Sequence, residues 1–323
     1  MTDPGPTIDW LLDSDPSLRW QVMRDLLDAP EPAWTAERAR VETEGWGARL
    51  LSHQDADGQW AGGAFLPRDF DPQEWEDVGQ PWTATAFSLS QLREFGLDPS
   101  SERARRTVEL IGAGSRWDHA GEPYWAGEVE ECINGRVVAD GAYFGVDVSP
   151  IVERLTGERL EDGGWNCERA NGSVRSSFAS TINVLEGLLE YERATGGTPQ
   201  SREARESGEE YLLQRHLFRR LTTGEVADQV FLSFLHPNRW RYDVLRALDY
   251  FRSAAELTGA TADPRLGEAV AHVRSRRSSD GRWRLDWSLP GRVWFDVDQR
   301  AGEPSRWITL RAMRVLRWWD GRG

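Results

Sequence analysis

The sequence is short of the features that mark membrane and secreted proteins. No apolar run approaches the roughly 18 residues that a membrane-spanning helix needs, and the mean hydropathy is −0.60. The N-terminal segment, MTDPGPTIDW, has neither the basic residues nor the apolar stretch of a signal peptide. Two cysteines, Cys132 and Cys167, are too few for a disulfide scaffold in 323 residues. These absences predict a cytoplasmic protein without a transmembrane segment.

Basic residues are also in deficit. Lys and Arg total 39 against 53 Asp and Glu, which gives a net charge of −14 at pH 7. Such a surface repels phosphate backbones, so we expect no nucleic-acid partner. The sequence contains no Gly-rich phosphate loop, dinucleotide fingerprint or His/Cys metal-ligand spacing, so we expect neither a cofactor nor a metal. The oligomeric state has no signature in the sequence.

Tryptophan is the residue in excess, with 17 in the chain. Three of them follow the same short motif, in which Asp-Gly stands just before Trp60, Trp165 and Trp283. Asp-Gly favours a tight turn, because Asp caps its own backbone and Gly accepts a positive φ. The recurring turn indicates a protein built of similar units, with each indole filling the wedge between neighbouring units.

Apolar residues at helical spacing precede and follow these turns. The stripe before a turn is narrow, as from Ala39 to Leu50, which is typical of an outer helix with one buried side. The apolar cover after a turn is broader, as from Phe178 to Leu189, which is typical of an inner helix. We expect further inner helices after Trp82, over 132–146, from Trp240 and from Trp307, outer helices over 100–111 and 266–273, and loops over 61–81, 112–127, 196–200 and 284–304.

Alternating outer and inner helices predict an all-α fold. Closing them into an (α/α) toroid of about five to six helical hairpins, with inner and outer helix rings, buries the inner faces without capping repeats. We expect residues 1–323 to form this single domain, with a helical extension over about residues 1–30. Such a toroid would enclose a Trp-lined central cavity at the starts of its inner helices.

The segment Asp162-Gly163-Gly164-Trp165, followed by an apolar helix, resembles the QW-type repeat of the terpenoid cyclase and protein prenyltransferase superfamily, to which squalene cyclase belongs. The resemblance covers most of residues 36–319 as a repeat pattern, and it is more specific for fold than for reaction. It implies an (α/α) toroid whose inner-helix N-termini surround a cavity for isoprenoids or lipidated peptides.

The sequence departs from both enzyme classes of that superfamily. The nearest counterpart of the cyclases' Asp-x-Asp-Asp box is Asp296-Val297-Asp298-Gln299, which lacks the last Asp. The prenyltransferases' zinc-binding positions fall on Val174 and Ser176, and Tyr242-Asp243 stands where that family has Tyr-His. We therefore expect neither the alkene-protonating box nor the zinc ligands of these enzymes.

Carboxylates at the expected starts of inner helices are the candidate catalytic groups. Burial of Glu130 within its acidic motif would raise its pKa and allow it to act as a general acid, whereas a solvated loop would leave it inert. Asp140 lies in an apolar stretch, either paired with Arg136 or facing the cavity. Asp243, near His236, is expected to act as a base or an orienting group, unless this segment only caps a helix.

Aromatic, cationic and thiol side chains near the same helix starts, together with Glu128 and Asn134 of the acidic motif, are candidate ligand-binding residues. They would hold a ligand by stacking and cation–π contact, unless they serve only to pack the repeats together. The set consists of Trp82, Trp125, Glu128, Cys132, Asn134, Tyr143, Cys167, Arg175, Phe178, His236, Arg239, Trp240, Tyr242, Arg306 and Trp307.

These patterns predict a protein that binds a hydrophobic or amphipathic small molecule in a central cavity. The chemistry we expect is metal-independent acid–base cyclisation or isomerisation, with cavity Trp residues shielding a cationic intermediate. A non-catalytic scaffold for a peptide or partner protein is the competing hypothesis, because the catalytic boxes of the family are missing. A glycosidase-like (α/α) barrel, with carboxylates about 5 to 9.5 Å apart, is a third hypothesis.

Overall fold

The computed structural model describes residues 5–321. In this range the regular elements are helices, α1 to α14 with short 3₁₀ turns, and β-structure is limited to isolated bridges. The prediction of an all-α protein is therefore confirmed. Among the described residues, no helix is both long enough and apolar enough to cross a bilayer.

Most helices lie where the apolar patterns predict them. The α-helices are α1 (Gly5–Leu12), α2 (Pro16–Asp25), α3 (Glu31–Ala39), α4 (Gly45–Ser52), α5 (Pro72–Val78), α6 (Thr85–Phe95), α7 (Glu102–Gly114), α8 (Glu131–Tyr143), α9 (Ser149–Gly157), α10 (Phe178–Thr195), α11 (Pro199–Leu213), α12 (Val244–Thr258), α13 (Gly267–Ser275) and α14 (Arg306–Trp319). The 3₁₀ turns are η1 (Arg40–Glu42), η2 (Tyr124–Ala126), η3 (Cys167–Asn171), η4 (Gln229–Leu232) and η5 (Pro264–Leu266).

Two differences from the predicted boundaries lie in the chain before α6, and both have physical reasons. The outer helix expected from Ala39 to Leu50 is broken, because α3 ends at Ala39 and α4 begins at Gly45, whose φ of +64° no α-helix can continue through. The expected loop 61–81 contains α5, which Pro72 opens at a position that needs no backbone N–H. Asp71 caps this helix by accepting a hydrogen bond from the Gln73 backbone N–H at 2.9 Å.

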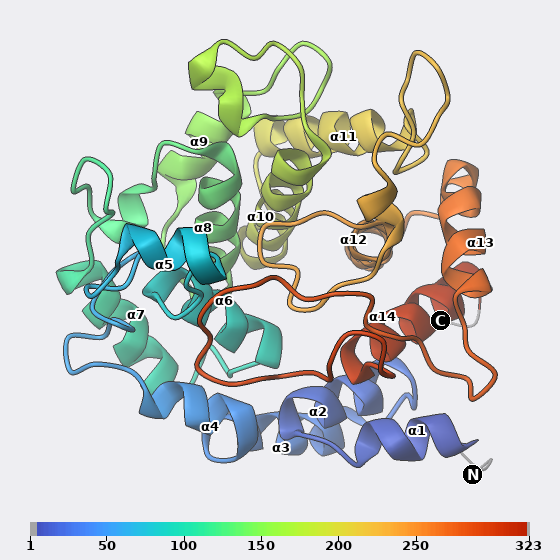
Figure 1. Cartoon of the computed structure of the whole chain (residues 1–323), viewed down its shortest axis with the longest axis horizontal. Coiled ribbons are helices and arrows are strands. Elements are labelled where there is room, and N and C mark those ends of the chain that lie inside the picture. The colour runs from blue at the N-terminus through green and yellow to red at the C-terminus, as the bar shows by residue number, and fades with distance from the viewer. Residues whose placement is uncertain (1–4, 322–323) are drawn as a thin grey trace.

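The helices α2, α6, α8, α10, α12 and α14 follow one another around the middle of the molecule (Figure 1). Each contacts the next, and α14 contacts α2, so the path of contacts returns to its start. The helices α4, α9, α11 and α13 lie on the outside, against α6, α8, α10 and α12 respectively. The N-terminal segment takes part in this packing through α2, while residues 1–4 lie outside the described residues.

The segment between α13 and α14 crosses the middle of the molecule without forming a helix (Figure 1). It reaches the residues that precede α6: the Trp82 backbone N–H donates to Arg292 O at 2.7 Å, and the Trp294 indole N–H donates to Thr83 O at 3.1 Å. The expected loop over 284–304 therefore spans from one side of the molecule to the other.

The three Asp-Gly-Trp turns fold alike, and each ties the helix before it to the helix after it. At the middle turn, the indole N–H of the fully buried Trp165 donates to Leu155 O in the last turn of α9, at 2.7 Å. The backbone N–H of Trp165 donates to the Thr181 hydroxyl in the first turn of α10, at 3.2 Å. One residue thus fixes the distance between α9 and α10.

The same two bonds recur at the other turns. In each of them the glycine has a positive φ, +88° at Gly58, +101° at Gly163 and +80° at Gly281, which explains the Asp-Gly sequence. The bonds join Trp60 to Leu50 O (2.8 Å) and Thr85 Oγ1 (3.1 Å), and Trp283 to Val273 O (2.7 Å) and Thr309 Oγ1 (3.0 Å).

Helices α8 and α10 approach each other closely because glycines face the contact. A Cβ atom on Gly135 of α8 would collide with the backbone at Asn183 of α10, and one on Gly187 would collide with the backbone of Gly135. Glycine weakens a helix in isolation, but here it allows two helix backbones to touch. The starts of α8 and α10 are consequently held side by side.

The centre of the molecule is charged. A cavity of about 250 Å³ is lined by side chains of α2, α6, α8, α10, α12 and α14, none of them tryptophan. Arg314 of α14 pairs with Asp249 of α12, with an Nε–Oδ1 distance of 2.7 Å, and with Asp25 of α2 at 3.2 Å. Burial alone would raise the pKa of Asp249, but the charges of Arg314 and Arg252 outweigh it and lower this pKa. The expected Trp lining is absent from this central cavity, because paired charged side chains form its wall.

Removing the hydroxyl of Thr181 should destabilise the fold through the Trp165 turn. Thr181→Val keeps the shape of the side chain but leaves the buried Trp165 N–H without an acceptor, for an expected loss of about 1–3 kcal/mol in the free energy of unfolding. Thr181→Ser, which keeps the hydroxyl, should lose less. Urea unfolding followed by circular dichroism measures both, and a Val variant as stable as the parent would contradict the assigned role.

Candidate functional site

A more apolar cavity, of about 350 Å³, lies beside the starts of α8 and α10. We refer to it as the α8–α10 cavity. Side chains from the segments around α5, α6, η2, η3 and residue 240 complete its wall. It is lined by Phe65, Trp75, Gln80, Ala86, Phe87, Tyr124, Glu130, Cys132, Ile133, Arg136, Val137, Asp140, Cys167, Ser177, Ala179, Ser180 and Trp240.

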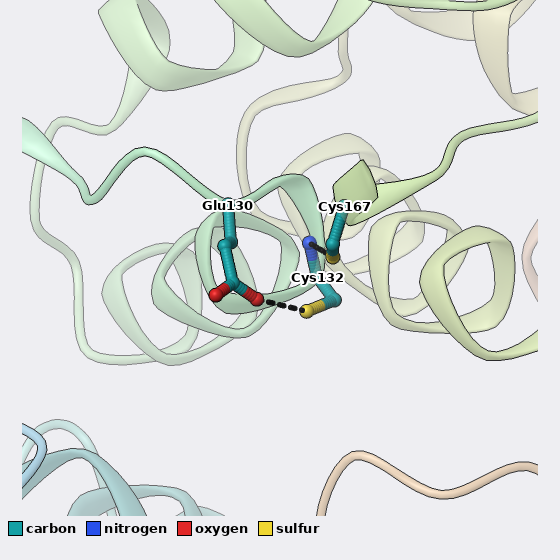
Figure 2. A group of neighbouring side chains, drawn as sticks. All are labelled: Glu130, Cys132 and Cys167. Carbon is teal, nitrogen blue, oxygen red and sulfur yellow. Dashed lines mark hydrogen bonds between the residues drawn. The ribbon is translucent and has the colours of Figure 1, made fainter. Parts of the chain in front are cut away.

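The two thiols of the chain meet in this cavity wall beside Glu130 (Figure 2). Glu130 is the N-cap residue of α8, and the Cys132 thiol donates to its Oε2 at 3.5 Å. The Cys132 backbone N–H donates to the Sγ of Cys167 at 3.2 Å. The hydrogen bond to Cys167, burial and the charge of Glu130 together raise the pKa of the Cys132 thiol well above its usual value.

Glu130 itself is exposed, and this bears on its predicted role as an acid. That role depended on burial, which raises a carboxyl pKa by disfavouring the charged form. The structure does not provide this burial, although the side chain lines the cavity. At Glu130 the acidic motif is therefore solvated, as the alternative interpretation expected.

Cys167 is held against α8 by contacts on both of its sides. Arg169, two residues further along η3, pairs with the buried Glu131 at the first position of α8, with an Nε–Oε1 distance of 2.6 Å. The Cys167 backbone N–H donates to the Ser180 Oγ of α10 at 3.1 Å, and the Ser180 hydroxyl donates to the Cys167 Sγ at 3.3 Å. These bonds fix η3 between the starts of α8 and α10.

Asp140 lines the cavity from the third turn of α8 and is 1% exposed. It pairs with Arg93 of α6, with an Nε–Oδ1 distance of 2.7 Å, and accepts a hydrogen bond from the Ser90 hydroxyl at 2.5 Å. The expected partner, Arg136, instead donates to Arg239 O. The carboxylate is therefore satisfied by the neighbouring helix rather than by its own.

Two buried polar groups in the cavity wall lack partners among the described residues. The Tyr124 hydroxyl belongs to a fully buried side chain, and Gln80 is 8% exposed; neither the hydroxyl nor the Gln80 Nε2 makes a hydrogen bond. Burial and the nearby charge of Asp140 raise the pKa of Tyr124 well above its usual value, so the hydroxyl keeps its proton. A buried polar group without a partner costs about 1–3 kcal/mol, so such groups point to a bound molecule or water.

Asp243 acts as the N-cap of α12, as the alternative interpretation had it. Its Oδ1 accepts from the Arg246 backbone N–H at 2.8 Å, and its Oδ2 accepts from the Asn238 side chain at 2.6 Å. Burial raises its pKa, and these hydrogen bonds offset part of that rise. The cap also explains why the helix expected from Trp240 begins only at Val244, and Trp240 is left free to line the cavity.

A further group of predicted residues lies near the segment that crosses the middle of the molecule, around a cavity of about 230 Å³. The His236 ring stacks on Trp307, with centroids 4.6 Å apart, and the Arg239 guanidinium lies 5.4 Å from the centroid of Trp82. Burial, with help from Arg311, lowers the pKa of His236 well below its usual value, and burial with Arg136 lowers the pKa of Arg239 to about 9.

The other predicted residues do not line the α8–α10 cavity. Their contacts are largely structural, because polar atoms at helix ends must be satisfied. The Asn134 side chain binds the Glu128 backbone N–H (2.7 Å) and C=O (2.6 Å), the Tyr143 hydroxyl donates to Leu97 O (2.8 Å), and the Trp125 indole N–H donates to Val108 O (3.3 Å). The Phe178 ring packs on Tyr242 with centroids 5.3 Å apart, and the Arg306 guanidinium lies 4.7 Å from the centroid of Trp10. Arg175 is exposed.

The sequence patterns missed Tyr124, Gln80, Arg136 and Ser180 as cavity residues. Tyr124 stands close before the acidic motif, which is the one local signal that could have marked it. Gln80 lies in a Pro- and Gly-rich loop whose path no periodicity predicts. Ser180 becomes relevant only because η3 folds back onto α10.

Comparisons with known proteins do not assign a family. No family model matches the chain, and no curated protein sequence matches it. A crystal structure of a protein from Actinoplanes aligns with 98% of this chain and 100% of its own, at 15% sequence identity and a TM-score of 0.47. A likeness at that level carries no argument about function.

The segment that resembles the cyclase box contains one carboxyl with a shifted pKa. Asp298 accepts a hydrogen bond from the Ser305 hydroxyl, but its burial outweighs that bond and raises its pKa from 3.8 to about 6. The folded state therefore holds this proton more tightly than the unfolded chain. The contribution of Asp298 to the free energy of unfolding therefore falls as the pH rises from 3.8 to about 6, and it stays constant above pH 6.

We expect a carbon-detected NMR titration of Asp298 to give a midpoint near pH 6. Asp298→Asn should remove the corresponding fall in stability, so parent and variant should differ in the slope of unfolding free energy against pH between the two pKa values. A midpoint at the ordinary Asp value, or parallel stability profiles, would contradict the burial of this carboxyl.

Proposed function

We propose that this chain is an (α/α) toroid of the terpenoid cyclase and protein prenyltransferase type, and that it binds a hydrophobic or amphipathic small molecule in the α8–α10 cavity. The closed path of contacts from α2 through α14 and back, with outer helices against inner ones, supports the toroid. The Asp-Gly-Trp turns support it further, because the same pair of bonds repeats at three joints.

The observation that carries the binding proposal is the composition of the cavity wall. Phe65, Phe87, Ile133, Val137 and Trp240 provide an apolar surface in a space large enough for a small molecule. A ligand that buries carbon against these side chains gains roughly 25 cal/mol for each Å² removed from water.

The polar part of the ligand is indicated by the groups that lack partners. The Tyr124 hydroxyl and the Gln80 amide N–H₂ are both donors, so a carbonyl, ether or hydroxyl oxygen would satisfy them. A molecule with one or two such oxygens on a hydrocarbon body fits both parts of the wall. A purely hydrocarbon ligand would leave the two donors unsatisfied.

The proposal is limited to binding. The expected acid–base chemistry needed free, buried carboxylates, whereas Asp140 is engaged by Arg93 and Ser90, Asp243 caps α12, and Glu130 is exposed. Nothing in these contacts supports Glu130 as a general acid.

Filling the cavity should abolish binding. Ala179 lies in the first turn of α10 and lines the cavity, so Ala179→Trp places an indole in it. Titration with the neutral amphipathic dye Nile red should show at least about a tenfold loss of affinity, which corresponds to 1.4 kcal/mol. Val174→Trp is the matched control, because Val174 is 77% exposed and outside the cavity wall.

Equal dye affinity in the parent and the Ala179→Trp variant would mean that the dye binds outside the α8–α10 cavity, which would contradict the proposed binding site. Native mass spectrometry of the purified protein applies the same comparison to any ligand that co-purifies. The Ala179→Trp chain should then carry less of it than the Val174→Trp chain.

The unpartnered hydroxyl of Tyr124 can be tested without a ligand. Tyr124→Phe removes a buried group that has no hydrogen bond, so the free energy of unfolding should stay unchanged or rise. Tyr242→Phe, at another buried tyrosine, removes a hydroxyl that donates to Leu217 O at 2.6 Å and should cost about 0.5–1.5 kcal/mol. A loss for Tyr124→Phe as large as that for Tyr242→Phe would mean that the hydroxyl has a protein partner.

A further inference from the structure

The wall of the α8–α10 cavity contains a set of side chains suited to a metal ion. Glu130, Cys132 and Cys167 each offer one ligand atom, and these atoms all lie within 4.8 Å of one another (Figure 2). We propose that these three residues bind a divalent transition-metal ion of the zinc class, with a fourth coordination position open to the cavity.

The spacing of the ligand atoms is close to what such an ion requires. Tetrahedral bonds of about 2.3 Å to sulfur and 2.0 Å to oxygen place neighbouring ligand atoms about 3.5–3.8 Å apart. The Cys132 Sγ already lies 3.5 Å from the Glu130 Oε2. The remaining distances are closed by side-chain rotation, because Glu130 is exposed and both cysteines are only half-buried.

The backbone that carries the ligands is held in place before any metal arrives. The Arg169–Glu131 ion pair fixes η3 to the first turn of α8, and the Cys167 backbone N–H is bound to Ser180 of α10. Binding therefore orders little more than three side chains, which keeps its entropic cost low.

Two hydrogen-bond donors face the sulfur atom of Cys167. The Ser180 hydroxyl and the Cys132 backbone N–H both donate to the Cys167 Sγ, at 3.3 and 3.2 Å, and such outer donors stabilise and orient a metal-bound thiolate. The partial positive charge at the start of α8 acts in the same direction. In forming the complex each thiol loses its proton to solvent, so two thiolates and one carboxylate surround the ion, with no change of oxidation state.

The chemistry of the ligands selects the class of ion. Two thiolates favour Zn²⁺ and related borderline or soft ions over Mg²⁺ and Ca²⁺, which prefer oxygen alone. Three protein ligands with an open fourth position are typical of a zinc site that binds a further molecule, whereas structural sites use four protein ligands. The sequence predicted no metal, because the ligands come from two segments that are 35 residues apart.

Cobalt titration of the reduced, full-length chain tests this assignment directly. Co²⁺ substitutes for Zn²⁺ and gives a thiolate-to-metal charge-transfer absorption. We expect one Co²⁺ per chain with this absorption, displaced by Zn²⁺ and unaffected by excess Mg²⁺. Since Cys132 and Cys167 are the only cysteines of the chain, the absorption reports on this site alone.

The variants separate ligands from positioning residues. Cys167→Ser and Cys132→Ser should each remove most of the absorption, while Glu130→Gln should keep it with a higher Kd. Ser180→Ala should keep the spectrum but raise Kd about 10- to 100-fold, as expected for a group that only positions a ligand. Glu168→Gln, at an exposed carboxylate next to Cys167, should bind Co²⁺ like the parent.

A reduced parent chain without charge-transfer absorption overturns the proposal, and so does a Cys167→Ser variant that binds Co²⁺ with parent affinity. If a cysteine variant loses helical circular dichroism, Glu130→Gln decides: an unchanged Kd overturns the three-ligand site. Because the probe is the metal alone, this outcome does not depend on whether the cavity binds Nile red.

Discussion

The structure depends on a simple requirement of tryptophan: an indole N–H in a dry interior must find an acceptor. At each Asp-Gly-Trp turn the acceptor is a carbonyl in the last turn of the preceding helix, and the Trp backbone N–H is bound by a threonine in the first turn of the following one. Each turn therefore fixes both the separation and the register of two helices. Repeated at three joints, it determines where α6, α10 and α14 begin, and the starts of α6 and α10 border the α8–α10 cavity.

The interior consists of two environments that the sequence composition does not distinguish. In the centre, arginines and carboxylates of successive inner helices neutralise each other, and desolvation is offset only because the pairs are close and numerous. Beside α8 and α10 the cavity wall is apolar. Gly135 and Gly187 allow these two helices to approach closely, and aromatic side chains line the space beside them. A small molecule with a hydrocarbon body is compatible with the second environment and not with the first.

The sequence predicted the helices well and the site in part, for reasons that can be named. Amphipathic periodicity is a local property, so the starts of α10 and α14 were predicted to within one residue. Glu130 and Cys132 were singled out because they stand at a helix start, and helix starts do border the cavity. The partner of Asp140 could not be predicted, because it lies on another helix at no fixed spacing. The threonine of each turn was missed for the same reason, since its separation from the tryptophan varies from 16 to 26 residues.

The charged centre has one property that follows from the choice of cation. The sequence contains no lysine, so every positive charge in that cluster is a guanidinium. Burial alone would lower the pKa of Arg314, but the charge of Asp249 outweighs it and raises this pKa above its usual value. Alkali therefore leaves the Arg314 guanidinium charged, whereas acid can neutralise the carboxylates of the cluster one by one. The Arg314–Asp249 pair is accordingly one-sided, because it is indifferent to base and is broken only by a strong excess of protons.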